Sequence, residues 1–277
     1  MSLNALQKTS AKLDTRSKLL RQQIIKTIHA GGRGHVGASM SLVEIMRVLY
    51  DHILKYNSQE PRWKDRDRHI LSKGHGCIAL YVLLAEKGFF PTEELWNFCK
   101  SDGLIGGHPE VKTPGVEAST GSLGHGLPIG VGMAINGKLD KKDYRVFVVI
   151  GDGESNEGSV WEAALCANKH KLDNLVVLVD YNKHQSYGST AEILDLEPLA
   201  EKWKAFGFSV KEVDGHDVGQ LQNILSKIPF EKNKPSVLIC HTIKGRGISF
   251  AENNMNWHHK NKFKEEELVK MFEELKV

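Results

Sequence analysis

The sequence lacks long hydrophobic runs, and it has few cysteines and little net charge. Its longest apolar stretches, such as Val146–Ile150 and Leu175–Val179, are far shorter than the ~20 residues that a membrane-spanning helix needs. The first residues also lack the apolar core of a signal peptide. A net charge of +3 without a dense Lys/Arg run argues against a nucleic-acid-binding protein. Because the four cysteines show no spacing typical of disulfides or of a metal site, we expect a reduced, cytoplasmic protein.

What the sequence does contain is the composition of a globular protein, with 40% hydrophobic and 26% charged residues. In its second half, apolar runs alternate with segments of helical periodicity. Strands that are apolar on both faces are typical of a parallel sheet covered on both sides. We therefore predict an α/β fold in which residues 1–277 form a single domain. Its sheet should be mostly parallel and lie between two layers of helices.

Hydrophobic periodicity gives the expected elements. Residues 101–126 are rich in Gly, Ser, Thr and Pro and show no sustained period. A long irregular stretch of this kind is usually functional or disordered. The predicted strands are 145–150, 174–180, 208–213 and 236–240, and the predicted helices are 14–29, 42–50, 78–87, 127–137, 161–170, 196–206, 218–228 and 262–277.

Residues 32–37 match the pattern G-x-G-x-x-G. In dinucleotide-binding proteins this pattern follows a strand and opens a helix. Here a predicted helix precedes it, and no acidic residue sits in the expected place at the end of a second strand. We therefore disfavour a dinucleotide-dependent dehydrogenase. The glycines are instead expected to allow a close backbone approach and to expose His35.

The strongest local signal is Gly151-Asp152-Gly153-Glu154, directly after a buried strand. The next strand along the chain ends at Asp180 and is followed by Asn182. Neighbouring parallel strands lie about 4.8 Å apart, so Asp152 and Asn182 should meet in the crevice where open α/β sheets bind ligands. A carboxylate, an amide oxygen, a backbone carbonyl and diphosphate oxygens are ligands that suit Mg²⁺. Taken singly, each of these motifs would only be a turn or a cap.

Thirteen histidines are present, and several stand in glycine-rich turns and not on helix faces. A histidine on such a turn has little to pack against and is more often exposed in a cleft. Neutral imidazoles can hydrogen-bond sugar hydroxyls and move protons near neutral pH. The histidines in this context are His35, His75, His108 and His258.

Seven segments occur in the order found in transketolases and span nearly the whole chain. They are RGHVGASMSLVEIMRVLY, DRDRHILSKGHGCIALY, GGHPE, STGSLGHGLPIGVGMA, GDGESNEGSVWEAA, VDGHD and TIKGRGISFAENNMNWH. The chain therefore resembles the N-terminal, diphosphate-binding part of the transketolases. Its GDG motif, followed thirty residues later by Asn182, resembles the thiamine diphosphate-binding motif.

The resemblance implies thiamine diphosphate and Mg²⁺ as cofactors, with Ca²⁺ or Mn²⁺ able to substitute. It implies Asp152, Asn182 and the carbonyl of His184 as metal ligands, and the four histidines His35, His75, His108 and His258 as catalytic residues. His216 is expected only to stabilise a turn. Two positions depart from the family pattern: Gln185 stands one residue short of a cofactor-contacting glutamine, and His125 stands where many transketolases have glutamine. The implied cofactor-binding residues are Lys73, His75, Gly121, Ser122, Leu123, Gly151, Asp152, Gly153, Glu157, Asn182, Lys244 and His258.

The activity that the resemblance implies is transfer of a two-carbon ketol unit from a ketose phosphate to an aldose phosphate through a thiamine diphosphate ylide. In transketolases a pyrimidine-binding domain would follow the residues that match Trp257, whereas here only a charged stretch, 262–277, follows. We therefore expect the N-terminal subunit of a split transketolase. Its partner should be a separate chain that carries the pyrimidine-binding and C-terminal domains, most simply in an α₂β₂ complex.

Three alternatives stay open at this point. A specialised transketolase could act on a sulfonated or branched sugar, and only the partner or neighbouring genes would reveal it. The α chain of a 2-oxo acid dehydrogenase also has a GDG motif and a separate partner, but it should lack the GHPE, TGSLG and histidine segments. A binding or regulatory remnant of the fold is disfavoured, because decay should remove residues such as Asp152 first.

Overall fold

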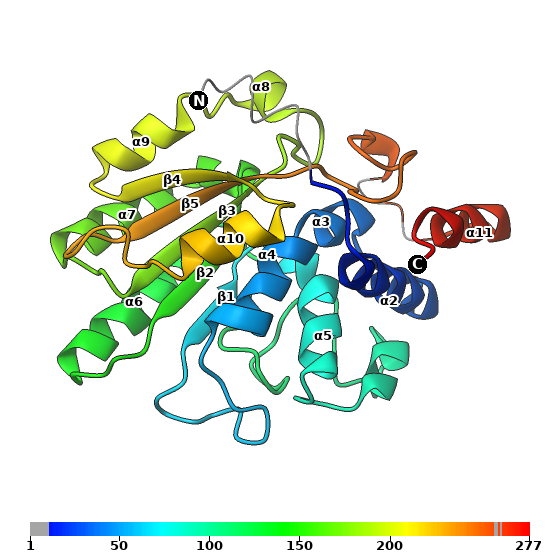
Figure 1. The fold of residues 1–277 in the computed structure, drawn as a ribbon, viewed down its shortest axis with the longest axis horizontal. Helices are drawn as coiled ribbons and strands as arrows, with labels where there is room; N and C mark the ends of the chain where they lie inside the picture. Colours follow the sequence, from blue (N-terminus) through cyan, green and yellow to red (C-terminus); the bar gives the residue numbers. More distant parts are fainter. Residues whose placement is uncertain (1–10, 258–259, 261) are drawn as a thin grey trace.

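Five parallel strands form the centre of the fold (Figure 1). This computed structural model describes residues 11–257, 260 and 262–277. The strand order is β1-β2-β3-β5-β4, and every neighbouring pair is parallel. The strands are β1 Arg68–Leu71, β2 Val146–Gly151, β3 Leu175–Tyr181, β4 Ser209–Asp214 and β5 Ser236–His241.

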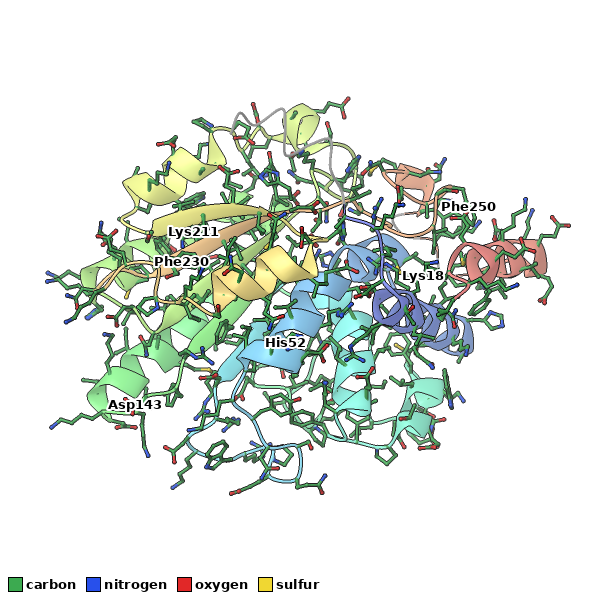
Figure 2. The ribbon with its side chains drawn as sticks, viewed as in Figure 1. Lys18, His52, Asp143, Lys211, Phe230 and Phe250 are labelled. Carbon is green, nitrogen blue, oxygen red and sulfur yellow. The ribbon has the colours of Figure 1, made fainter. Side chains whose placement is uncertain are left out.

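The predicted strands are confirmed, and β1 is the one that the sequence did not predict. Every residue of β2 and β3 is buried, as expected for apolar runs in the middle of a parallel sheet. In contrast, β1 has only four residues, and its sequence RHIL has polar side chains at its first two positions. It forms the sheet edge by pairing with β2 alone. At the opposite edge, Lys211 of β4 lies over the ring of Phe230, 4.5 Å from its centroid (Figure 2).

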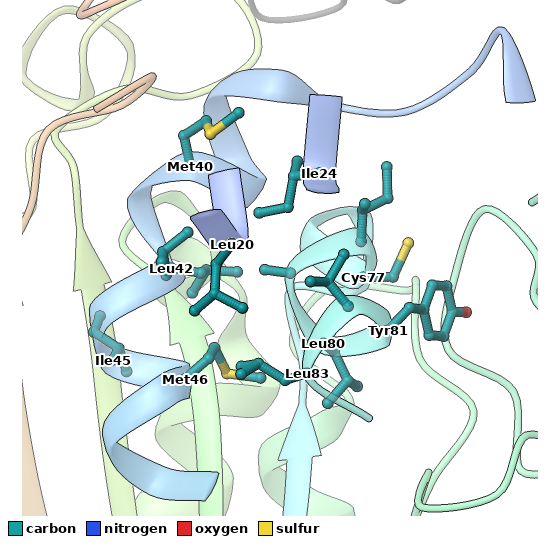
Figure 3. Close-up of a cluster of buried hydrophobic side chains, with 14 of the residues drawn as sticks. Leu20, Ile24, Met40, Leu42, Ile45, Met46, Cys77, Leu80, Tyr81 and Leu83 are labelled. Carbon is teal, nitrogen blue, oxygen red and sulfur yellow. The ribbon is translucent and has the colours of Figure 1, made fainter. Parts of the chain in front are cut away.

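Two hydrophobic cores cover the two faces of the sheet, which confirms the predicted three-layer α/β fold. Along β2, Phe147 and Val149 face the first core, whereas Val146, Val148 and Ile150 face the second. Helices α2 to α5 and α10 pack on the first core, and α6, α7 and α9 pack on the second (Figure 1). Figure 3 shows the first core where side chains of α2, α3, α4 and α5 interdigitate.

The helices follow the predicted segments, with ends set by local chemistry. The side chain of Asp14 caps the first turn of α2 by accepting from Ser17 N, and Gly32, with a φ of 60°, ends it. Two short helices, α3 and α8, were not predicted. The helices are α2 Thr15–Gly31, α3 Val36–Ser41, α4 Val43–Val48, α5 Cys77–Glu86, α6 Gly126–Leu139, α7 Gly158–Lys169, α8 Thr190–Ile193, α9 Leu199–Ala205, α10 Val218–Leu225 and α11 Glu265–Glu274. Within the described part of the chain, no helix is long and apolar enough to cross a membrane.

The glycine-rich segments behave as the sequence indicates. Residues 32–35 join α2 directly to α3, so a helix and not a strand precedes this glycine-rich segment, and it is not a dinucleotide fingerprint. A Cβ atom at Gly37 would lie 3.0 Å from Cγ of Lys244, so this glycine makes room for a lysine side chain. Residues 101–125 contain no helix or strand. They return to the sheet, where the Thr120 hydroxyl donates to the carbonyl of Leu71 at 2.7 Å.

Candidate functional site

Most of the predicted site residues line one cavity at the carboxyl ends of the central strands. Gly151, the last residue of β2, pairs with Asp180 of β3. Asp152 and Asn182 therefore leave the same edge of the sheet, as the sequence predicted. Both line a cavity of about 240 Å³ at this edge. The other residues that line it are Lys73, His75, Leu123, Gly151, Gly153, Glu154, Asn156, Glu157, His184, Gln185, Ser186, Tyr187 and Lys244.

Each oxygen atom of the predicted metal site is held in place by a hydrogen bond from a nearby nitrogen. The Asp152 carboxylate accepts from the backbone N–H of Gly153 at 2.7 Å and from that of Lys183. The side-chain oxygen of Asn182 accepts from His184 N at 3.1 Å. The carbonyl of His184 accepts from Lys244 Nζ at 3.1 Å. The three candidate ligands thus share one wall of the cavity.

The charges of the cavity suit a divalent cation bound together with an anion. Burial, and then the neighbouring charge of Asp180, raise the pKa of Asp152 to about 6. Burial, and then repulsion by Lys73, lower the pKa of Lys244 to about 8. A cation beside Asp152 and an anion beside Lys244 would each relieve the cost of burying the charged side chain. The side-chain nitrogen of Gln185 is also buried without a hydrogen-bond partner in the structure, although the residue lines the cavity.

Lys73 lines the cavity, but its ammonium group is paired with a residue that the sequence analysis did not single out. Lys73 Nζ lies 2.5 Å from Asp180 Oδ2, and both side chains are buried. Asp180 also accepts from the hydroxyls of Ser41, at 2.7 Å, and Thr242. Burial alone would raise the pKa of Asp180, but Lys73 and these hydroxyls lower it. The sequence signal that could have found Asp180 is its charge within the otherwise apolar run of β3.

Glu154 is a second residue to which the sequence analysis gave no role, although it belongs to the GDGE motif. It is 2% exposed, and its carboxylate accepts from Gly151 N at 3.0 Å, from Gly124 N at 2.9 Å and from the Ser72 hydroxyl. The Ser72 hydroxyl in turn accepts from Gly126 N at 3.0 Å. Glu154 thereby joins the end of β2, the end of β1 and the loop before α6. Its position just after the GDG turn was the only sequence signal.

Of the residues 121–123, which were predicted to lie along the cofactor, only Leu123 lines the cavity. Glu157 also lines the cavity, and it directly precedes the first turn of α7. Gly121 lies against His108, because a Cβ atom there would be 3.0 Å from the imidazole. The Ser122 hydroxyl, in contrast, lies 3.2 Å from Nδ1 of His125 in an exposed pair.

Three of the four predicted catalytic histidines are described, and His258 lies outside the described residues. The rings of His35 and His75 are 5.4 Å apart in an edge-to-face arrangement, and His75 lines the cavity. The loop that carries His108 reaches the same region, because Gly74 lies against Gly121, which contacts the His108 ring. The carbonyl of His108 accepts from the Tyr81 hydroxyl at 2.7 Å. Figure 3 shows this hydroxyl pointing out of the apolar cluster.

This arrangement can hold a phosphorylated ligand with its metal and can present several imidazoles to it. Carboxylate, amide and carbonyl oxygens meet the needs of Mg²⁺, which prefers a few protein oxygens together with phosphate oxygens. No group of three or more His, Cys, Asp or Glu side chains among the described residues could hold a metal by itself. The candidate set has one carboxylate and therefore depends on oxygens supplied by a ligand.

Comparisons with known proteins agree with the geometry. Residues 14–276 match the family described as "Transketolase, thiamine diphosphate binding domain". The chain is 40% identical over 247 residues to one of the subunits of the apulose-4-phosphate transketolase of Phocaeicola vulgatus, covering 89% of this chain and 88% of that protein. It is also 40% identical to the 6-deoxy-6-sulfo-D-fructose transketolase subunit SqwG of Clostridium sp., covering 89% of this chain and 90% of that protein.

Solved structures give the same fold. Transketolase from Leishmania mexicana superposes with a TM-score of 0.88 at 32% identity, covering 96% of this chain and 42% of that one. Transketolase from Campylobacter jejuni superposes with a TM-score of 0.88 at 30% identity, covering 99% of this chain and 43% of that one. The chain thus spans about two fifths of the solved proteins that it matches.

Proposed function

Because the chain belongs to the transketolase family and matches its thiamine diphosphate-binding domain, we propose that it is the cofactor-binding subunit of a two-component transketolase. The reaction is transfer of a two-carbon ketol unit from a ketose phosphate to an aldose phosphate. The observation that carries the proposal is the cavity where Asp152, Asn182, Lys244 and His75 converge at the carboxyl edge of the sheet. When bound, thiamine diphosphate supplies a nucleophilic carbon and an electron sink for cleavage beside the ketose carbonyl.

We assign the metal and diphosphate to the cavity wall described above. Asp152, Asn182 and the carbonyl of His184 hold Mg²⁺, and Lys244 binds the diphosphate. The side-chain nitrogen of Gln185, which has no hydrogen-bond partner among the described residues, adds a donor beside them, although Gln185 stands one residue short of the family position. Lys73 contributes its charge from its place beside Asp180. The remaining proposed contacts are made by Gly121, Ser122, Leu123, Gly151, Gly153 and Glu157.

The histidines act on the sugar. His35 and His75 stand edge to face, so one sugar oxygen can reach both rings and a proton can pass between that oxygen and either imidazole. His108 holds the hydroxyl of the two-carbon unit, and His258 completes the set. If these roles are correct, His108→Ala will impair use of the ketose donor more than cofactor binding. An equal loss of both would make His108 a structural residue.

We propose that residues 1–277 form one diphosphate-binding domain and that a second polypeptide completes the site. The support is in the relatives: two of them are named as transketolase subunits, and the chain covers 88% and 90% of their length. The partner would carry the pyrimidine-binding domain, most simply in an α₂β₂ complex that works in the cytoplasm.

A specialised substrate is the second candidate function. The subunits named for apulose 4-phosphate and for 6-deoxy-6-sulfo-D-fructose are 40% identical to this chain, and human transketolase is 41% identical. The percentage of sequence identity therefore does not tell whether this chain acts on a common sugar phosphate or on an unusual one. The names of the subunits favour including a branched and a sulfonated sugar in the test.

The test is a ketol-transfer assay on this chain purified with the proteins that accompany it from its own cells. Xylulose 5-phosphate and ribose 5-phosphate are supplied with thiamine diphosphate and Mg²⁺, and apulose 4-phosphate and 6-deoxy-6-sulfo-D-fructose are tested in parallel. The isolated chain and a complex that carries Asp152→Ala serve as controls. Activity in the complex alone supports the proposal, and the active sugar identifies the substrate. Activity in the isolated chain would refute the need for a partner.

A further inference from the structure

A buried ionic network lies behind the cavity, and the proposed function does not use it. It consists of Arg21 on α2, Glu44 on α4 and His216 in the turn after β4, with exposures of 0%, 0% and 2%. Arg21 binds the Glu44 carboxylate through Nη1 at 2.6 Å and Nη2 at 2.9 Å. Glu44 Oε2 lies 2.7 Å from Nδ1 of His216. Burial alone would raise the pKa of Glu44, but Arg21 and His216 lower it.

The hydrogen bonds define which ring nitrogen of His216 carries a proton. Nε2 of His216 accepts from the backbone N–H of Ile243 at 2.9 Å, so it must present a lone pair. Nδ1 faces a carboxylate and therefore carries the proton that it donates to Glu44. The imidazole is thus neutral, and Glu44 fixes both its tautomer and the plane of its ring.

The network holds both ends of one short turn. Ile243, at the start of the turn, donates to His216. Arg246, at its end, accepts at its carbonyl from Nε of Arg21 at 2.7 Å. Between them, Gly245 N donates to the carbonyl of Gly37 at 3.2 Å. Lys244 is the residue that this turn presents to the cavity.

The direction of Lys244 depends on its backbone because its side chain has few other anchors. It is 5% exposed, and Nζ has one hydrogen-bond acceptor in the structure, the carbonyl of His184. A long side chain with four rotatable bonds would otherwise gain entropy and hydration by turning toward water. A turn fixed at both ends removes that freedom before the ligand binds.

We propose that His216, held by Glu44 and Arg21, is a positioning residue that fixes the turn 243–246 and so directs Lys244 into the cavity. It touches neither the cavity nor the reacting atoms. What Lys244 binds rests on the proposed function, whereas the geometry of the turn does not.

Two isosteric substitutions separate the two bonds of the imidazole. In His216→Gln the longer side chain can place its amide oxygen where Nε2 lies and keep the acceptor for Ile243. In His216→Asn the shorter side chain can place its N–H where Nδ1 lies and keep the donor to Glu44. We expect the Ile243 bond to be lost only in His216→Asn, while the carboxylate stays paired.

The first measurement is amide hydrogen exchange in the cofactor-free protein. One hydrogen bond contributes about 1 kcal/mol, so Ile243 should exchange about fivefold faster in His216→Asn. The exchange rate at Ile243 should stay within about threefold of wild type in His216→Gln, and the amides of β5 should be unchanged in both variants. Equal acceleration at Ile243 and along β5, or no acceleration at Ile243, would overturn the proposal.

The second measurement is the affinity of this chain, purified together with its partner, for thiamine diphosphate with Mg²⁺ by calorimetry. Lys244→Met is the control that removes the charge directly. We expect His216→Asn to weaken binding about fivefold, as one lost hydrogen bond would, and His216→Gln to restore it. Wild-type affinity in His216→Asn, when Lys244→Met binds weakly, would overturn the proposal. A wild-type complex of this chain with its partner that does not bind the cofactor would refute the proposed function, and the exchange experiment would then decide the positioning role by itself.

Discussion

The carboxylate of Glu154 offers a sharp test of how the diphosphate end of the site is built. One of its oxygens accepts from Gly124 N at 2.9 Å and from the Ser72 hydroxyl, and the other accepts from Gly151 N at 3.0 Å. All three donors are protein groups, and the side chain is 2% exposed. Glu154→Gln preserves the shape of the side chain but replaces one acceptor oxygen with a donor NH₂ group.

The size of the effect follows from counting these bonds. The amide can keep its oxygen on the side that accepts two bonds, and its NH₂ group then faces the backbone N–H of Gly151. Leaving a buried donor unsatisfied costs about 1–3 kcal/mol. Removing a buried charge offsets part of the loss, because burial raises the pKa of Glu154 and so disfavours its charged form. We expect the free energy of unfolding to fall by about 2 kcal/mol.

The assay is urea unfolding of the wild type and of Glu154→Gln at pH 7, with Glu201→Gln as a matched control. Glu201 is exposed and pairs with Lys204 on the same helix, so its substitution should cost less than ~0.5 kcal/mol. The affinity for thiamine diphosphate should also fall, since Gly151 lines the cavity. A Glu154→Gln protein as stable as the control would refute the role of the carboxylate as acceptor for three donors.

Three further predictions concern the metal site, the His108 loop and acid stability. Asp152→Ala should abolish Mg²⁺-dependent cofactor binding in calorimetry while circular dichroism shows an intact fold, and an unchanged affinity would reject the metal assignment. Tyr81→Phe removes the donor to the His108 carbonyl, so the free energy of unfolding should fall by about 1 kcal/mol. KM for the ketose should rise while the cofactor affinity stays constant. A parallel loss of cofactor affinity would contradict this prediction. Burial lowers the pKa of His69 to about 3 from an ordinary 6.5, so its neutral ring contributes stability that is present above pH 6.5 and lost as the pH falls toward 3. Between pH 7 and 5 the wild type should lose about 2 kcal/mol more than His69→Gln in urea unfolding, and equal losses would refute this.

The sequence alone was sufficient for features that depend on neighbours in the chain. Continuous β-branched runs predicted β2, β3 and β5, because a strand buried on both faces needs apolar residues at every position. The GDG turn predicted a site at the end of β2, because glycines allow a tight turn there, and the structure has a cavity at this place. Seven ordered segments then indicated the family, which the comparison confirmed.

The tertiary structure decided features that depend on residues far apart in the chain. The four residues of β1 form a strand because they pair with the edge of β2. The sequence of β1 is too short for its pattern to predict a strand. Lys73 was expected near the cofactor, yet its ammonium group is paired with Asp180, 107 residues away. His216 was expected only to stabilise a turn, but it also joins Glu44 to Ile243. Buried polar groups must find partners, and the fold alone determines which ones come within reach.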